Sequence, residues 1–380
     1  MIRRMNYEFF KATHFAAVVV FVIVFFWHCD YTLTSWHYFV ATAAVYGPCF
    51  VYPWLRTAFE YGFTQKAYVH IEGNGFIRLT VPSVNMCWKP GQHCFLRFTS
   101  LGLQAFSSHP FTICSLPTIR ANEKSELVFY IRHSQGLTKK LYEHARKQPE
   151  TPISVLIDGP YGGINMQRFN DADRLLVIAG GSGAGWILSF LELFCRQLST
   201  AGATGRSVEN VTTAIDEESS FERRRSLHIV LATRDIDSRT WFLETVVEVF
   251  AKYSLPQRPE DITFEVHLTG DAERSVSIVR STEDVGLFSS SSAENIEVET
   301  KGNRPMVLGK ELPGRPDLPL TIHREGEVAA VEGKALSVYI CGPITMQNDV
   351  RNAVARENLA ILRGAKSGGV YLHSEHFSWA

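Results

Sequence analysis

Apolar residues gather in two long runs near the start of the chain, at residues 9–27 and 36–59, which only a few polar residues interrupt. A run of about 20 apolar residues is long enough to cross the hydrocarbon core of a bilayer as a helix. We therefore expect two membrane-spanning helices, at about residues 8–28 and 36–59. Together they would form a partial transmembrane domain over residues 1–62.

Basic residues flank these two runs. Arg3 and Arg4 precede the first run and Arg56 lies near the end of the second, whereas the connection between the runs holds Asp30 and no basic residue. Because basic residues favour the cytoplasmic side, both ends of the pair and the rest of the chain are expected in the cytosol. A cleaved signal peptide is the alternative, but bulky residues stand where its cleavage site would be and a second apolar run follows.

The hydrophobic pattern changes after residue 62. Short alternating runs separated by Gly and Pro, such as "KAYVHIEGNGFIRLTV" and "ELVFYIRH", predict a small antiparallel β-barrel over residues 63–165. Over residues 166–380, apolar strands alternate with segments of helix length, which predicts a parallel sheet with crossover helices. Two stretches rich in Ser, Thr, Glu and Gly, at about residues 199–226 and 271–304, are expected to be exposed insertions.

Composition narrows the class of protein. The chain has 380 residues, 45% of them hydrophobic, which is enough for about two or three compact units. A formal net charge of -1 lacks the basic character of a nucleic-acid-binding protein, so no nucleic acid is expected as a partner. The seven cysteines include no C-x-x-C pair, so the sequence indicates neither a disulfide framework nor a zinc site.

A glycine-rich turn lies in "LLVIAGGSGAGW", where Gly180, Gly181, Gly183 and Gly185 surround Ser182 between a buried strand and a helix. Backbone amides at such a turn can approach a pyrophosphate at the positive end of the helix. The spacing departs from the full G-x-G-x-x-G pattern, so a purely steric role for the glycines stays open.

The next strand ends in "ATRD", at the position where a parallel nucleotide-binding sheet reads the adenine ribose. Arg234 would favour a 2′-phosphate and therefore NADPH, whereas Asp235 could accept a hydrogen bond from a free 2′-hydroxyl. A surface ion pair is the plainer role for Arg234. With the rest of the pattern included, NADPH is the favoured cofactor.

The segment "HPFTICSLP" begins like a strand and groups His109, Pro110, Phe111 and Thr112. It offers a ring that can stack on a flavin and a hydroxyl that can bond to a flavin or a phosphate. The residues alone do not decide between these ligands.

Eight segments occur in an order that resembles the ferric reductase and NADPH oxidase family: "KPGQHCFLRF", "HPFTICS", "IRHSQGLT", "IDGPYGG", "AGGSGAG", "ATRD", "GRPD" and "YICGP". They cover nearly all of the chain after the apolar runs, and "AGGSGAG" and "YLHSEHFSW" are more similar to fungal ferric reductases than to oxidases. The resemblance implies a combined all-β and α/β fold like that of ferredoxin reductases, an antiparallel FAD barrel followed by a Rossmann-like NADPH domain. It also implies that the N-terminal part of the membrane domain is lacking.

The resemblance further implies roles for individual residues. The expected FAD ligands are His109, Pro110, Phe111 and Thr112, with Arg132, Gly136 and Thr138 at the pyrophosphate. The expected residues of the nucleotide-side turn are Gly159, Pro160, Tyr161 and Gly162. NADPH is expected on Gly180, Gly181, Ser182, Gly183, Gly185 and Arg234, with its nicotinamide at Cys341, Gly342 and Pro343.

Three assignments are more open than these. Phe377 is the best match for the aromatic residue that the family stacks on the flavin, although Trp379 competes with it. For Arg315 in "GRPD", a cofactor contact and a role in loop geometry are equally supported interpretations. The chain departs from the family after the glycine loop, where Trp186 and Ile187 replace a pair of small residues, and this puts the geometry of the loop in doubt.

The first apolar run has a histidine at each end, His14 and His28. Fourteen residues of helix separate them by roughly 21 Å and return them to within about 40° of one face. Two histidines at the headgroups would fit this spacing, whereas the resemblance implies ligands of two b-type haems. In that family two helices each supply two histidines, and this chain has one such helix. His37 lies at the outer end of the second expected span and His70 in the barrel, so neither can supply the missing transmembrane ligand.

The function that the resemblance implies is a multi-pass membrane enzyme, an NADPH-dependent ferric-chelate reductase that passes electrons through FAD and haem to extracellular iron. The plasma membrane is the expected location, with the vacuolar membrane as an alternative. Its partners would be ferric chelates, membrane lipid and a second polypeptide supplying the missing haem ligands. Superoxide production from oxygen is one alternative function, and a truncated flavoprotein that serves as an assembly partner is another.

Overall fold

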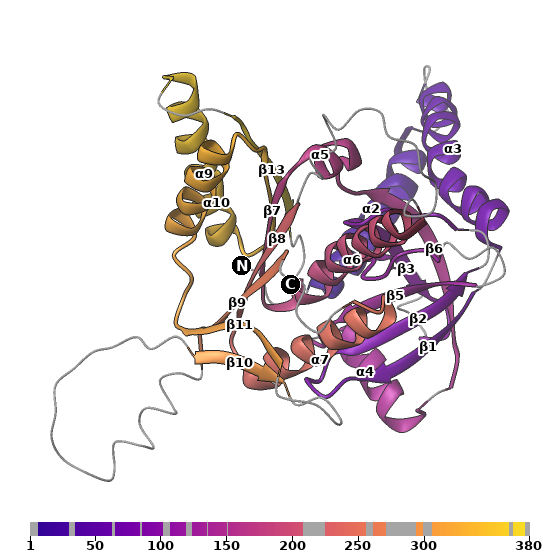
Figure 1. Cartoon of the computed structure of the whole chain (residues 1–380). Coiled ribbons are helices and arrows are strands. Elements are labelled where there is room, and N and C mark those ends of the chain that lie inside the picture. Colours follow the sequence, from indigo (N-terminus) through magenta and orange to yellow (C-terminus); the bar gives the residue numbers. More distant parts are fainter. Residues whose placement is uncertain are drawn as a thin grey trace, which may run out of the picture.

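A computed structural model describes most of the chain (Figure 1). The residues that it describes are 7–29, 35–62, 65–83, 86–101, 107–118, 124–134, 136–149, 151–207, 225–255, 261–270, 294–298, 306–364 and 368–376. They form an N-terminal helix pair, an antiparallel sheet and a mainly parallel sheet with helices on both faces.

Two helices occupy the positions of the expected membrane spans, α2 (Tyr7–Cys29) and α3 (Ser35–Tyr61). The helix α3 contains Pro48 and Pro53. Over their described residues, neither of these helices nor any other in the structure combines the length and the apolar character needed to cross a membrane. The expectation of two helices is therefore met, while their membrane-spanning character finds no support in this result.

The antiparallel sheet has the strand order β4-β3-β6-β1-β2-β5. Its strands are β1 (Gln65–Ile71), β2 (Ile77–Ser83), β3 (Gln92–Phe98), β4 (His109–Thr112), β5 (Ser125–Ile131) and β6 (Ile153–Gly162). Residues alternate between buried and less buried along β3 and β6, as the sequence pattern predicts for strands with one face on a core. The helix α4 (Leu137–Lys147) packs its apolar side against that core. The strand β4 lies at an edge of the sheet, which leaves one side of it accessible.

The second sheet has the order β10-β11-β9-β8-β7-β12-β13. Its strands are β7 (Arg174–Gly180), β8 (Ser226–Thr233), β9 (Ile262–Leu268), β10 (Glu294–Val298), β11 (Met306–Pro313), β12 (Leu336–Gly342) and β13 (Val370–His376). All neighbours are parallel except β10 and β11. The crossover helices are α6 (Ala184–Ser207), α7 (Ile236–Lys252), α9 (Leu318–Glu332) and α10 (Ile344–Leu362).

The helices of this second domain divide between the two faces of its sheet. The helices α6 and α7 lie on the face toward the antiparallel sheet, and α9 and α10 cover the other face (Figure 1). A short helix, α5 (Met166–Asp171), connects the two domains. The predicted parallel sheet with crossovers is thus confirmed, and the whole arrangement is the expected ferredoxin-reductase-like one.

The two predicted insertions lie largely outside the described residues, which exclude 208–224 and 271–293. The first range overlaps the end of α6, which continues to Ser207. The second contains β10, which the sequence pattern did not predict. The strand β10 pairs antiparallel with β11 and so extends the sheet by an edge hairpin.

One buried hydrophobic cluster spans the boundary between the two domains. Phe76, Leu116 and Ile164 from the antiparallel domain belong to the same buried cluster as Trp241 of α7. Phe76 and Trp241 have ring centroids 5.4 Å apart. Burial of large aromatic side chains across a domain boundary favours one fixed orientation of the two domains.

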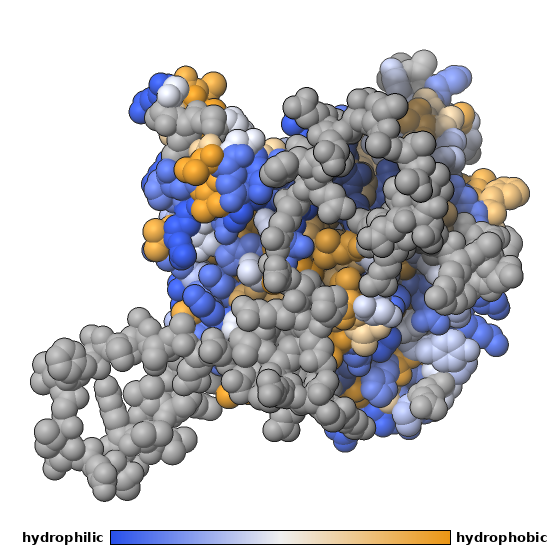
Figure 2. Space-filling model, viewed as in Figure 1, coloured by the Kyte–Doolittle hydropathy of each residue, from blue (hydrophilic) through white to orange (hydrophobic). Residues whose placement is uncertain are grey.

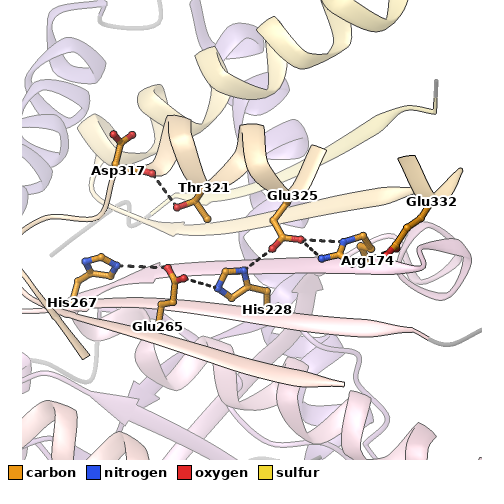
Figure 3. A network of polar contacts seen from close by, with 8 residues as sticks. All are labelled: Arg174, His228, Glu265, His267, Asp317, Thr321, Glu325 and Glu332. Atoms are coloured by element: carbon orange, nitrogen blue, oxygen red, sulfur yellow. Dashed lines mark hydrogen bonds and ion pairs between the residues drawn. The ribbon is translucent and has the colours of Figure 1, made fainter. Parts of the chain in front are cut away.

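A chain of charged side chains runs between the parallel sheet and α9 (Figure 3). Arg174 Nη2 donates to Glu325 Oε2 at 2.7 Å, and His228 Nδ1 lies 3.0 Å from the other oxygen of Glu325. His228 Nε2 lies 3.6 Å from Glu265 Oε1, and His267 Nε2 lies 3.9 Å from Glu265 Oε2. Glu325 thus lies between Arg174 and His228, and Glu265 lies between His228 and His267.

Candidate functional site

The expected flavin motif lies on the accessible edge of the antiparallel sheet. His109, Pro110, Phe111 and Thr112 form β4, and all four side chains are half-buried. The register of β3 brings this motif beside the nucleotide-side turn, because His93 is paired with Thr112 on one side and with Tyr161 on the other. Two segments that are far apart in the sequence therefore meet at one end of the barrel.

The other expected FAD residues lie where β5 leads into α4. Arg132 follows β5 and is exposed, and Gly136 has a φ of 62° at the N-cap of α4. This helix start has no side-chain cap and no acidic residue in its first turn. Free N–H groups at a helix N-terminus bind phosphate, so the position fits a flavin pyrophosphate. The hydroxyl of Thr138 accepts a hydrogen bond from Ser134 N at 3.0 Å and holds the loop closed.

Tyr161 has partners that the sequence did not indicate. Its hydroxyl donates to Asp158 Oδ1 at 2.5 Å and accepts from Arg56 Nη1 of α3 at 3.1 Å. Tyr61, at the end of the same helix, donates to the carbonyl of Gly159 at 2.5 Å. Burial and the bond to Asp158 raise the pKa of Tyr161 to about 12. The turn at residues 159–162 therefore binds α3 to the barrel.

The glycine-rich loop connects β7 to α6 as expected. Gly181 has a φ of 58°, and a side chain placed there would point into open space. A 3-10 turn over Gly181–Gly183 leads into α6, whose first turn holds no acidic residue. Ser182 stands in the middle of this turn. The loop thus offers backbone N–H groups and free space, which is what a dinucleotide pyrophosphate requires.

The glycine loop lies against the barrel at Gly185. A Cβ at this position would lie 3.0 Å from Cys114 Sγ and 3.2 Å from Tyr130 Cδ2. Cys114 follows the flavin motif by two residues, and Tyr130 precedes Arg132 by two. The start of the nucleotide-binding helix and the two segments expected to bind FAD therefore meet at the domain junction.

The expected nicotinamide segment packs against the same glycine loop. The register of β12 pairs Cys341 with Ala179, one residue before Gly180. A Cβ on Gly342 would lie 2.9 Å from Met346 Sδ and 3.5 Å from Gly180 N, so a side chain there would require the Met346 side chain to move. Burial raises the pKa of the Cys341 thiol, with Glu375 and Cys114 acting in the same direction. The thiol is therefore protonated at neutral pH, and its place in the site is that of a small neutral group.

Arg234 lies at the carboxyl end of β8, one strand away from the glycine loop, and its side chain is exposed. The neighbouring Asp235 is the N-cap of α7 and accepts from Ser238 N at 2.7 Å. Arg315 is exposed in the loop after β11, where Gly314 N donates to the carbonyl of Leu268. Both arginines thus lie at the carboxyl edge of the parallel sheet, where such sheets bind ligands.

Two of the expected residues, His14 and His28, are not brought to this junction. His14 and His28 are both exposed on α2, and His14 stacks on Phe10 with ring centroids 5.7 Å apart. Within the described residues no group of three or more His, Cys, Asp or Glu side chains has a geometry that could hold a metal ion. Phe377 and its competitor Trp379 lie outside the described residues, just beyond the end of β13.

Trp186, the departure noted after the glycine loop, is a core residue. It is 2% exposed, and its ring packs on Phe190 with centroids 4.4 Å apart. Its indole faces Gly91 of the barrel, where an added Cβ would lie 3.6 Å from Trp186 Nε1. The bulky side chain therefore fills the domain boundary and leaves the glycine loop itself open.

Sequence reasoning missed Glu192, which joins the two domains from α6. One carboxylate oxygen accepts from Leu116 N of the barrel at 3.1 Å, and the other accepts from Lys252 Nζ at 2.5 Å and from Tyr253 Oη at 3.1 Å. A lone Glu within the run "AGWILSFLELFCRQL" is the signal that could have indicated it. A carboxylate on the buried face of a helix needs partners.

Two family models match the chain. An FAD-binding domain matches residues 62–165, and a ferric reductase NAD binding domain matches residues 172–355. Both matches fall on the two sheets described above, and neither includes α2.

Curated relatives and solved structures are similar to the chain over different lengths. The Ferric/cupric reductase transmembrane component 7 of Saccharomyces cerevisiae is 34% identical over 50% of the chain and 30% of its own length. A probable cell surface ferric reductase of Aspergillus oryzae is 32% identical over 56% of the chain and 29% of its own length. A probable ferric reductase transmembrane component of Candida albicans is 26% identical over 100% of the chain and 50% of its own length. A ferredoxin-NADP+ reductase structure from Plasmodium falciparum has a TM-score of 0.44 and 10% identity, covering 83% of the chain and 97% of its own. The chain thus spans half, or less, of the length of these curated relatives.

Proposed function

This chain belongs to the ferric reductase family, and from that membership we propose that it is an NADPH-dependent reductase that passes electrons through FAD to ferric chelates. The observation that carries the proposal is the contact of Gly185 with Cys114 and Tyr130. It joins the expected NADPH loop to the two segments expected to hold FAD. A hydride can pass directly between two cofactors only where their binding segments adjoin in this way.

The residues of the barrel fit FAD. We infer that β4 holds the isoalloxazine through Phe111 and Thr112, while Arg132, Gly136 and Thr138 hold the pyrophosphate at the uncapped start of α4. FAD, when bound, supplies the conversion of a two-electron donor into one-electron steps, which reduction of Fe(III) requires. The task of the protein side chains is to place and shield the cofactor, since transfer of a hydride and of single electrons demands no catalytic acid or base.

The residues at the carboxyl edge of the parallel sheet fit NADPH rather than NADH. Arg234 is exposed and can form charge-assisted hydrogen bonds to a 2′-phosphate. Asp235, the residue that would favour a free 2′-hydroxyl, is engaged as the N-cap of α7. The proposal therefore assigns the preference for NADPH to Arg234.

Membrane attachment and haem are further parts of the proposal. Large apolar side chains are exposed along α2, including Phe15 at 70% and Trp27 at 76%. Figure 2 shows apolar surface also at the upper right, over α3. Exposed apolar surface on this scale indicates contact with lipid or with another helix. The names of the relatives, "transmembrane component" and "cell surface", support a location at a membrane.

We infer that His14 and His28 would each help to hold a haem iron, together with a histidine from another helix. That helix would belong to a second polypeptide or to a segment outside this chain. The acceptor would then be a ferric chelate on the far side of a plasma or vacuolar membrane. Arg56 and the domains after it would face the cytosol.

The test is spectroscopic and enzymatic on the same purified chain. We expect bound FAD in the absorption spectrum and NADPH-dependent reduction of ferricyanide, which accepts electrons from a flavin directly. Absence of both FAD and NADPH oxidation would refute the reductase. A dithionite-reduced difference spectrum tests haem separately. Stoichiometric superoxide without reduction of a ferric chelate would assign the acceptor to oxygen instead of iron.

A further inference from the structure

The first turn of α10 contains a fully buried amide that joins two segments of the proposed site. Gln347 is 0% exposed, and its Nε2 donates to the carbonyl of Gly342 at 2.8 Å and to the carbonyl of Glu375 at 2.9 Å. Gly342 ends β12, and Glu375 is the penultimate residue of β13. Both hydrogens of one amide group thus hold two different strands at their carboxyl ends.

Arg351, one turn further along α10, fixes the orientation of this amide. Its Nη2 donates to Gln347 Oε1 at 3.2 Å and to Ser374 Oγ at 2.9 Å. A guanidinium can only donate, so the amide oxygen must face Arg351 and the amide nitrogen must face the two carbonyls. If the amide group were flipped, its oxygen would face the two carbonyls and neither carbonyl would have a donor.

One of the two segments held by Gln347 is the expected nicotinamide segment, and the other is the strand beside it. Gly342 packs against Gly180 of the glycine loop, next to the position expected for the nicotinamide. The strand β13 runs parallel to β12, with Cys341 paired to Glu375 and Gly342 paired to His376. Gln347 therefore ties Gly342, at the end of the nicotinamide segment, to the neighbouring strand β13.

Resting on the proposed function, we propose that Gln347, oriented by Arg351, is a positioning residue that sets the register between the nicotinamide segment and the C-terminal strand for hydride transfer. In that reaction one hydride passes from NADPH to FAD, NADPH is oxidised to NADP+, and a proton from water completes the reduction of FAD. Gln347 touches neither reactant. It acts through Gly342 and Glu375, whose carbonyls it fixes within hydrogen-bonding distance.

A merely structural role for Gln347 makes a different prediction. Loss of a buried amide that only supports the fold would weaken the whole domain, including the remote binding site for the adenine half of the cofactor at β8. Loss of a positioning residue would slow the transfer and leave that adenine site intact. The two halves of the cofactor can be probed separately, because 2′-phospho-AMP carries the adenine half alone.

The variants are Gln347→Met, which keeps the length of the side chain without its hydrogen bonds, and Arg351→Met. The matched control is Gln197→Met on α6, where an arginine also donates to the amide oxygen, from Arg225 Nη1 at 2.7 Å. Three quantities are measured on the full chain carrying FAD: the rate of flavin reduction by NADPH in a single turnover, the Kd for 2′-phospho-AMP, and amide hydrogen exchange in residues 368–376.

We expect Gln347→Met to slow flavin reduction by about tenfold or more, because misplacement of reacting groups by a fraction of an ångström costs rates of this order. The Kd for 2′-phospho-AMP should stay within about twofold, and exchange in residues 368–376 should accelerate. Arg351→Met should slow reduction by about threefold, and Gln197→Met should change none of the three quantities. These expectations rest on single-turnover rates, in which product release does not enter.

Unchanged flavin reduction in Gln347→Met would overturn the inference, as would loss of 2′-phospho-AMP binding in parallel with the rate. If Gln347→Met does not fold, the rate of flavin reduction in Arg351→Met becomes the test, because the exposed side chain of Arg351 can be removed without opening the core. Failure of the unaltered chain to be reduced by NADPH would refute the proposed function itself, and that result is distinct from an effect confined to the variants.

Discussion

The carboxylate of Glu192 accepts a hydrogen bond from the backbone N–H of Leu116 at 3.1 Å, so a helix of the second domain binds the segment that follows the flavin motif of the first. Lys252 and Tyr253 at the end of α7 donate to the other oxygen. One buried carboxylate thus holds three elements, and its removal leaves a buried N–H without an acceptor.

Replacing Glu192 with Leu should lower the free energy of unfolding by about 2 kcal/mol, because the Leu116 N–H loses its partner. Glu192→Gln should cost about half as much, since its amide oxygen still accepts from Leu116. Urea unfolding of the full chain measures both, with exposed Glu244→Gln on α7 as the control. Equal effects of Leu and Gln at this position would contradict the assignment.

Glu325 makes the stability of the parallel sheet depend on pH. Burial alone would raise the pKa of Glu325, but the hydrogen bonds and charges of His228 and Arg174 outweigh it and lower the pKa to about 2. A carboxylate with a depressed pKa stabilises the fold above its unfolded value and loses that contribution as the pH falls toward the folded value. Glu325→Gln should therefore cost about 3 kcal/mol at pH 7, and the difference from the unaltered chain should shrink between about pH 4.5 and pH 2.

Unfolding free energies measured across that pH range test the expectation for Glu325. The matched control is Glu327→Gln on the same helix, whose side chain is 49% exposed. A cost of Glu325→Gln that stays constant from pH 7 to pH 3 would show that the carboxylate is not the group that titrates.

Arg234 should set the choice between the two nicotinamide cofactors. Arg234→Ala should raise the KM for NADPH by about 10-fold to 100-fold and leave the KM for NADH nearly unchanged, because only NADPH carries the 2′-phosphate. Asp235→Asn should keep the preference for NADPH, since asparagine caps a helix about as well as aspartate does. A loss of NADH use in Asp235→Asn would instead assign the ribose contact to Asp235.

Gly185 should tolerate no side chain without cost. A methyl group there would crowd Cys114 Sγ and the Tyr130 ring, so Gly185→Ala should lower the free energy of unfolding by about 1–2 kcal/mol. It should also slow flavin reduction by NADPH, because the two domains must separate slightly to admit it. Gly73→Ala is the control, since a Cβ at that position meets nothing within 4 Å. An unchanged rate would show that Gly185 does not set the distance between the domains.

Much of this architecture follows from local pattern. The alternation in β3 and β6 and the strand-then-helix order after Arg174 predicted the two sheets because periodicity reports which face of each element is buried. The strand β10 escaped prediction because it lies within a stretch of polar composition and obtains its pairing from β11. Tertiary pairing, which the local sequence does not encode, decided its structure.

The candidate site likewise contains some features that the sequence predicts and others that only the structure shows. The glycine loop and the flavin motif are contiguous segments, so their chemistry was visible in a few residues. Glu192 binds Leu116, 76 residues away in the sequence, and Gln347 binds Glu375, 28 residues away. No local sequence pattern identifies these partners. Trp186 departs from the family pattern, and only the structure shows that its side chain is buried at the domain boundary.

The pairing of β7 with β12 has a consequence for how the protein is made. The strand β7 joins residues 174–179 to residues 336–341, so one edge of the strand before the glycine loop stays without its partner until the ribosome has passed residue 341. Contacts between segments so far apart form late and slowly. The barrel can fold while synthesis continues, whereas the nucleotide half can be completed only after residue 341 has been synthesised.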